Sequence, residues 1–380
     1  MDFDRIVDRR NSGSIKWERY GDALPLWVAD MDFQAPEPVI EALRRRVAHG
    51  IYGYALPPPE LPAVIQAWLE ERHGWRVPVE AISCLPGVMR GVNMTARAVG
   101  VPGDGILIQP PVYPPFFDVP KYQQRELQCA RVPRAGGRYE IDFDAFEAAI
   151  GDRTRLFLLC NPHNPIGRAY SRAELEQLAE ICLRHDVIIC SDEIHSDIVF
   201  RGYRHLPIAS LSPEVAAHTV TTLAPSKTFN IPGLACSVLI IENPELRRQV
   251  VAAGAGLVGG CNIMGYTAML AAYQEGAGWL DALLDYLEAN CDYLADFVAG
   301  RMPGIAMDRP EATFLAWLDC REAGIEGNLH TFFLERAGVA LNDGPTFGPG
   351  GDGWLRLNFG CPRATLTEAL ERMADALAQL

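Results

Sequence analysis

Two patterns of apolar residues alternate through the middle of the chain. Short apolar runs without polar alternation occur at residues 106–109, 156–160, 187–191, 219–223 and 237–241. Such runs are typical of strands covered on both faces. Between two of them, Ser171 and Glu174 form a capping box that opens a helix with an apolar stripe. The alternation predicts a mostly parallel, doubly wound α/β sheet with ligands at the carboxyl ends of its strands.

The two ends of the chain show a different pattern, with longer helical stretches and fewer strands. At the N-terminal end the pattern predicts a helix closed by Gly50. At the C-terminal end it predicts a long helix over residues 279–298, strands at 313–318 and 354–359, and a last helix opened by Thr365 and Glu368. We therefore expect a smaller α+β domain beside the large sheet domain.

Charge and cysteine content narrow the classes of partner and compartment. The net charge of -14 argues against nucleic acid or an anionic membrane as a partner. The ten cysteines form no Cys-x-x-Cys pair, and the charged N-terminus resembles no signal peptide, so we expect free thiols in the cytoplasm. The uncharged stretch 250–273 predicts a buried glycine-rich loop and a helix rather than a membrane span.

Lysine is rare in this chain, where Lys16, Lys121 and Lys227 stand against 31 arginines. Lys227 lies in a turn after the apolar run 219–223. There a primary amine can lose its proton and form a Schiff base, which a guanidinium cannot do. We interpret Lys16 and Lys121 as residues without a special role.

Three predicted strands end in polar residues that we expect to meet over one crevice. Asn164 follows the run 156–160, Asp192 follows 187–191, and Lys227 follows 219–223. An amide, a carboxylate and a lysine in this arrangement suit an aldehyde cofactor with a pyridine nitrogen. The lysine forms the imine, the carboxylate keeps the ring nitrogen protonated, and the amide donates to the ring hydroxyl.

Other motifs in the chain fail their structural requirements. Residues 192–195 look like an ATPase acidic box, but no Gly-x-x-x-x-Gly-Lys loop is present. Residues 254–259 match a dinucleotide fingerprint by letter, yet they follow a helix-like stretch rather than a strand. The histidines show no paired metal-ligand spacing, and no Gly-x-Ser-x-Gly elbow occurs, so we expect no metal site and no serine-hydrolase site.

The motifs at the strand ends resemble those of the class I/II aminotransferase superfamily of pyridoxal-phosphate-dependent fold type I. They read Asn161-Pro-His-Asn164-Pro-Ile-Gly, Ser191-Asp192-Glu-Ile-His195 and Ser226-Lys227-Thr-Phe-Asn230-Ile-Pro-Gly. Further stretches are similar to its cystathionine β-lyase branch of the MalY/PatB type: Ala29-Asp-Met-Asp-Phe33, His49-Gly-Ile-Tyr-Gly-Tyr54 and Arg356-Leu-Asn-Phe-Gly-Cys-Pro-Arg363.

The resemblance implies a two-domain fold and a carbon-sulfur lyase. The large domain would be residues 49–278, with a mostly parallel seven-stranded sheet between helices. The smaller α+β domain would come from both chain ends, residues 1–48 and 279–380. The implied reaction releases thiol, pyruvate and ammonia from cystathionine or related S-substituted cysteines. An aminotransferase using the same residues is the alternative, and a regulatory protein with incidental catalysis is a third.

Carried over position by position, the resemblance implies a site for pyridoxal 5'-phosphate. Lys227, Asp192 and Tyr113 are the predicted catalytic residues: the amine that binds the aldehyde, the partner of the pyridine nitrogen, and the ring that stacks on the cofactor. Asn164 would donate to the ring hydroxyl, and the predicted cofactor-binding set includes His195.

The phosphate is predicted to lie at a helix N-terminus. The backbone N–H groups of Gly87, Val88 and Met89 would hold it, as expected for an anion at such a place. Ser226 would add a hydroxyl. Tyr54 would reach the phosphate of a neighbouring subunit, which implies a homodimer with a shared site.

The substrate carboxylate is predicted to bind Arg356, with Asn164 beside it. Two positions depart from the superfamily pattern: Ala224 replaces a hydroxyl residue, and Ala235 replaces a phosphate-binding arginine. The missing arginine also fits the lyase branch, whereas Ala224 predicts weaker phosphate binding.

Overall fold

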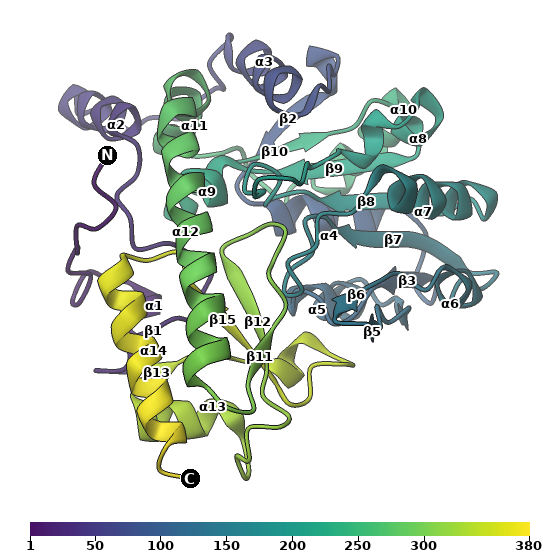
Figure 1. Ribbon diagram of the computed structural model, residues 1–380. Helices are drawn as coiled ribbons and strands as arrows, with labels where there is room; N and C mark the ends of the chain where they lie inside the picture. The colour runs from purple at the N-terminus through teal and green to yellow at the C-terminus, as the bar shows by residue number, and fades with distance from the viewer.

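A seven-stranded sheet forms the centre of the computed structural model, which describes residues 1–380 (Figure 1). The strand order is β2-β10-β9-β8-β7-β3-β4. Strand β10 is antiparallel to both neighbours, and the other pairs are parallel. The bounds are β2 Ile82–Leu85, β3 Gly105–Ile108, β4 Glu126–Cys129, β7 Thr154–Cys160, β8 Ile188–Asp192, β9 Thr219–Leu223 and β10 Ser237–Ile240. The predicted sheet is confirmed, and the five predicted strands are β3, β7, β8, β9 and β10.

Helices cover both faces of the sheet because successive strand residues point to opposite faces. Ile106 and Ile108 of β3 join a buried cluster with Val92 of α4, and Leu107 joins another with Leu175 of α7. Helix α7 begins with the capping box that the sequence predicts. The helices of this part are α3 Leu61–His73, α4 Val88–Ala98, α5 Pro115–Tyr122, α6 Phe143–Ala148, α7 Arg172–Arg184, α8 Pro213–Ala217, α9 Pro225–Thr228, α10 Pro244–Ala253 and α11 Ile263–Glu275.

A second sheet, in the order β11-β12-β15-β14, is formed by the C-terminal part of the chain. The N-terminal segment joins this part because β1 pairs in parallel with β13, and helices α12 and α14 lie side by side next to it (Figure 1). The bounds are β1 Leu24–Pro25, β11 Ala306–Met307, β12 Leu315–Asp319, β13 Val339–Ala340, β14 Asn342–Asp343, β15 Trp354–Asn358, α1 Ile15–Glu18, α12 Ala277–Arg301, α13 Leu329–Phe332 and α14 Arg363–Leu377. Helix α2, Glu37–His49, instead packs against α11. A small hairpin, β5 Arg134–Ala135 and β6 Arg138–Tyr139, completes the strands. The domain boundaries stay a prediction, and the one at residue 279 falls inside α12.

Two local expectations are wrong. Helix α14 begins at Arg363, two residues before Thr365, because Pro362 is its N-cap with an extended ψ of 142° and no side-chain cap marks the start. The glycine-rich loop between α10 and α11 is largely exposed rather than buried, since its glycines leave few side chains to pack. None of the helices has the length and apolar character needed to cross a bilayer.

Candidate active site

The carboxyl ends of β7, β8 and β9 open into one cavity of about 310 Å³. Parallel strands end at the same edge of a sheet, which brings residues distant in sequence together. Every predicted site residue except Tyr54 lines this cavity: Gly87, Val88, Met89, Tyr113, Asn164, Asp192, His195, Ser226, Lys227 and Arg356. On a single chain the Tyr54 side chain is fully exposed and lies outside the lining.

Lys227 enters the cavity from α9, a single helical turn that follows β9. Its Nζ donates a hydrogen bond to the backbone oxygen of Ala29, and it forms no salt bridge. Burial lowers the pKa of this amine from 10.5 to about 8, against the opposing charge of Asp30. The charge of Arg356 acts in the same direction as burial. An amine with this pKa is partly neutral near neutral pH, so it can act as a nucleophile and a base.

Asp192 is the last residue of β8 and is almost fully buried. Burial raises its pKa to about 7, while the Ile194 N–H, which donates to Oδ1 at 3.1 Å, and the Lys227 charge oppose the rise. A carboxyl group poised in this way would become a stable anion when a positive group binds beside it.

Arg356 of β15 crosses from the second sheet into the cavity, where it meets Asn164. Its Nη1 donates to Asn164 Oδ1 at 2.9 Å, and its Nη2 donates to the Trp27 carbonyl and to Asn342. Burial lowers the pKa of this guanidinium to about 10. The Asn164 oxygen is thereby occupied, which leaves the amide NH₂ of this residue as a donor toward the cavity.

The start of α4 forms another wall of the cavity. Gly87 has a φ of 132°, which favours glycine, and its N–H donates to Ser237 Oγ at 3.1 Å. Because the Gly87 N–H already donates to Ser237, it is less available to bind a phosphate than the sequence predicts. The N–H groups of Val88 and Met89 open the helix and have no intrahelical acceptor, so they remain suited to an anion.

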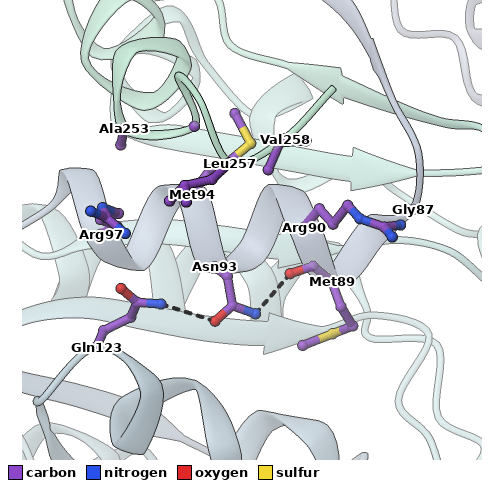
Figure 2. Close-up of a pocket in the computed structure, with 11 residues that line it drawn as sticks. Gly87, Met89, Arg90, Asn93, Met94, Arg97, Gln123, Ala253, Leu257 and Val258 are labelled. Atoms are coloured by element: carbon purple, nitrogen blue, oxygen red, sulfur yellow. Dashed lines mark hydrogen bonds between the residues drawn. The ribbon is translucent and has the colours of Figure 1, made fainter. Parts of the chain in front are cut away.

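A second cavity of about 410 Å³ lies along α4 and shares Gly87 and Met89 with the first. Figure 2 shows its residues, with Asn93 hydrogen-bonded to Gln123 and to the Met89 carbonyl. The loop with the dinucleotide-like letters borders this cavity and follows helix α10, not a strand. The predicted helix before the fingerprint residues is thereby confirmed.

Sequence reasoning missed the N-terminal segment that closes the site. Val28 and Ala29 line the cavity. Asn358 donates to the carbonyls of Val28 and Asp30, both at 2.7 Å, and holds this segment in place. Only the family resemblance marks the motif at residues 29–33, because no local rule connects it with residues 200 or 300 positions away.

Lys16, for which the sequence predicts no special role, has a structural one. Lys16 is 1% exposed, and its Nζ lies 2.7 Å from Asp32 Oδ2 and 3.7 Å from Asp30 Oδ1. Arg9 also contacts both carboxylates. A buried lysine is tolerated when carboxylates pair with it, so Lys16 is part of an ion cluster next to the site.

Comparison of the sequence with known proteins identifies the family of this chain. The sequence profile of the class I and II aminotransferases matches residues 22–373. The chain belongs to this family. Among its relatives, the cystathionine beta-lyase PatB of Bacillus subtilis (strain 168) is 43% identical over 389 aligned residues that cover 100% of each chain.

Solved structures of the family confirm the predicted fold type I. A PLP-bound putative aminotransferase from Clostridium difficile 630 has a TM-score of 0.97 at 39% identity and covers 99% of each chain. Cystalysin from Treponema denticola, which contains a pyridoxal 5'-phosphate cofactor, has a TM-score of 0.96 at 33% identity, covering 100% of this chain and 99% of that one.

Proposed function

We propose that this chain is a pyridoxal 5'-phosphate-dependent carbon-sulfur β-lyase. It releases a thiol, pyruvate and ammonia from cystathionine or a related S-substituted cysteine. The main observation behind the proposal is the buried amine of Lys227, with a pKa of about 8, in a cavity that also holds Asp192 and Arg356. The similarity to a cystathionine beta-lyase at 43% identity supports the choice of lyase within the family.

The residues of the cavity fit the cofactor. Two buried polar atoms of the lining, His195 Nδ1 and Arg356 Nε, have no hydrogen-bond partner within the protein, and buried polar atoms normally have one. Lys227 would bind the aldehyde, Asp192 would face the pyridine nitrogen, and the Asn164 amide would donate to the ring hydroxyl. When bound, the cofactor withdraws electrons from the α-carbon of the substrate and makes the α-proton acidic.

The opposite end of the cavity would hold the phosphate and the ring face. The Val88 and Met89 N–H groups and the Ser226 hydroxyl supply donors for a dianion. Tyr113 would stack on the cofactor ring, since its side chain lines the cavity. Phe116 packs edge-on against the Tyr113 ring, with 6.2 Å between the ring centroids, and supports the position of that ring.

The chain's own groups then bind the substrate and move its proton. Arg356 would bind the substrate carboxylate beside Asn164 through its Nε, which has no partner within the protein. Lys227, released when the substrate amino group replaces it on the aldehyde, would remove the α-proton as a neutral amine and later return it to the departing thiolate. Breaking the carbon-sulfur bond leaves a three-carbon amino acid fragment, and water converts this fragment to pyruvate and ammonia.

We further propose a cytoplasmic homodimer in which Tyr54 reaches the partner's phosphate site. Tyr54 stands in an exposed segment with Ile51, Tyr52 and Leu56, all more than half exposed on the single chain. A contiguous apolar stretch of this kind is typical of an interface.

The free cysteines support a reducing compartment, and the negative charge supports a small-molecule substrate rather than nucleic acid.

The deciding experiment measures pyruvate release from L-cystathionine by purified protein with pyridoxal 5'-phosphate and no oxo acid. The proposal expects sustained release over many turnovers, with free thiol appearing in equal amount. Release that stops after about one equivalent per site and resumes on addition of an oxo acid would make the protein an aminotransferase. A protein that never binds the cofactor would instead favour a regulatory role.

A further inference from the structure

Behind the cavity, the turn that carries Lys227 is joined to a buried carboxylate. Thr228, the next residue, is 1% exposed, and its Oγ1 donates to Asp197 Oδ2 at 2.8 Å. The Asp197 side chain is 5% exposed. Neither Thr228 nor Asp197 lines the cavity. Their hydrogen bond therefore acts on the Lys227 amine only through the position of the turn.

Helix α3 holds Asp197 in place from the other side. Trp68 Nε1 and His73 Nε2 each lie 3.1 Å from Asp197 Oδ1. Burial raises the pKa of Asp197, but the hydrogen bonds of His73 and Thr228 and the His73 charge outweigh burial and lower it. Asp197 is thus a fixed anion that connects a thirteen-residue helix to the lysine turn.

The lysine turn needs such support because α9 has only four residues. A helix this short has almost no hydrogen-bond ladder of its own. Three residues after Lys227, Asn230 accepts from the Met31 N–H at 2.9 Å and donates to the carbonyls of Met31 and Phe33. Thr228 thus attaches the lysine turn to α3 through Asp197, and Asn230 attaches it to the N-terminal segment at residues 31–33.

We propose that Thr228 and Asp197 are positioning residues, whose hydrogen bond sets the direction in which Lys227 enters the cavity. This inference rests on the proposed role of Lys227 as the amine that binds the cofactor and moves the α-proton. A displacement of about 1 Å at such a group costs on the order of 10²-fold in rate. Thr228 and Asp197 would therefore matter to turnover without touching substrate or cofactor.

The experiment compares isosteric variants of two buried threonines. Thr228→Val removes the hydroxyl at almost constant volume, and Thr228→Ser keeps it. Thr219→Val is the matched control, because Thr219 is also 1% exposed, donates to the Val215 carbonyl at 2.7 Å, and lies at the opposite end of β9. We expect Thr228→Val to lower kcat by about 10-fold to 100-fold with KM changed less than about threefold. Thr228→Ser and Thr219→Val should keep kcat within about threefold of the native value.

A second measurement does not depend on turnover. Pyridoxal 5'-phosphate is added to cofactor-free protein, and the rate of Schiff-base formation is followed by absorbance across pH. Misplacement of Lys227 predicts a slower rate in Thr228→Val at every pH, with an unchanged midpoint. Asp197→Ala should show the same change. If Asp197→Ala does not fold, Thr228→Val still tests the inference.

Three outcomes would overturn the inference: a Thr228→Val protein that matches Thr219→Val in both measurements, a shifted midpoint with an unchanged limiting rate, or a Thr228→Ser protein as slow as Thr228→Val. Failure of the native protein to form the Schiff base would instead refute the proposed function. The two failures are thereby distinguished.

Discussion

Two neighbouring regions of the molecule each bury a lysine, and their surroundings differ. In the N-terminal ion cluster, formed by Arg9, Lys16, Asp30 and Asp32, the lysine Nζ lies 2.7 Å from a carboxylate oxygen. In the cavity, Lys227 has a backbone carbonyl as its hydrogen-bond acceptor and no salt bridge. The first lysine is held as half of an ion pair, while burial lowers the pKa of the second to about 8.

The comparison shows that burial alone does not decide what a lysine does. A paired buried charge contributes to the structure, because removing either partner leaves the other charge uncompensated. An unpaired buried amine loses its proton more easily and becomes available for chemistry. Rarity in the sequence pointed to lysine but could not separate the two cases.

The largest effect should come from Lys227→Met. We expect pyruvate release to fall by about 10³-fold or more, because the variant lacks the amine that binds the cofactor and moves the proton. Steady-state kinetics with L-cystathionine measures this loss, and thermal melting should show that the fold persists. Activity within about tenfold of native would refute the role of Lys227.

Lys16→Met should show the opposite result, a loss of stability of about 3 kcal/mol, because Asp32 would stay buried with fewer positive partners. Urea unfolding measures this change, and activity per folded molecule should change little. Lys121→Met is the matched control, since Lys121 is exposed and forms no salt bridge, and its stability should stay within about 0.5 kcal/mol of native. Equal stability of the Lys16 and Lys121 variants would contradict the comparison.

The pH dependence of unfolding sharpens the contrast. In the cofactor-free protein, the folded pKa of Lys227 is about 8 and its ordinary value is 10.5, so between these pH values the unfolded state binds the proton and the folded state does not. Stability of the native protein relative to Lys227→Met should therefore rise with pH in this window, by about 3 kcal/mol in total. A difference independent of pH would show that the pKa of Lys227 is not lowered.

Arg356→Lys tests whether the cavity needs a planar cation. A lysine ammonium is a point charge that cannot serve the Asn164, Asn342 and Trp27 oxygens together with a substrate carboxylate. We expect KM for cystathionine to rise by about tenfold or more. An unchanged KM would show that Arg356 does not bind the carboxylate.

The smallest expected effect comes from Ala224→Ser, which adds a hydroxyl to the cavity lining before Ser226. One further hydrogen bond to the phosphate should tighten cofactor binding by about threefold to tenfold. Titration of cofactor-free protein with pyridoxal 5'-phosphate measures the affinity. Weaker binding would mean that the phosphate does not lie near residue 224.

Much of the fold and site could be predicted because the signals are local. Apolar runs predicted the five central strands, and polar residues directly after three of them predicted where Asn164, Asp192 and Lys227 meet. Strands β2 and β4 were not found from their pattern; β4 is an edge strand with mostly exposed residues, so burial left no apolar run in the sequence. The start of α14 was misplaced because a proline, rather than a side-chain cap, precedes it.

The sequence by itself determined the five central strands, the three strand ends and the family, because each depends on residues close together along the chain. Only the tertiary structure decided that Ala29 accepts from Lys227, that Arg356 contacts Asn164, and that Lys16 is paired whereas Lys227 is not. These contacts join residues up to about 200 positions apart. The pKa of a buried group depends on all charges and dipoles around it in space, so no local pattern can state it.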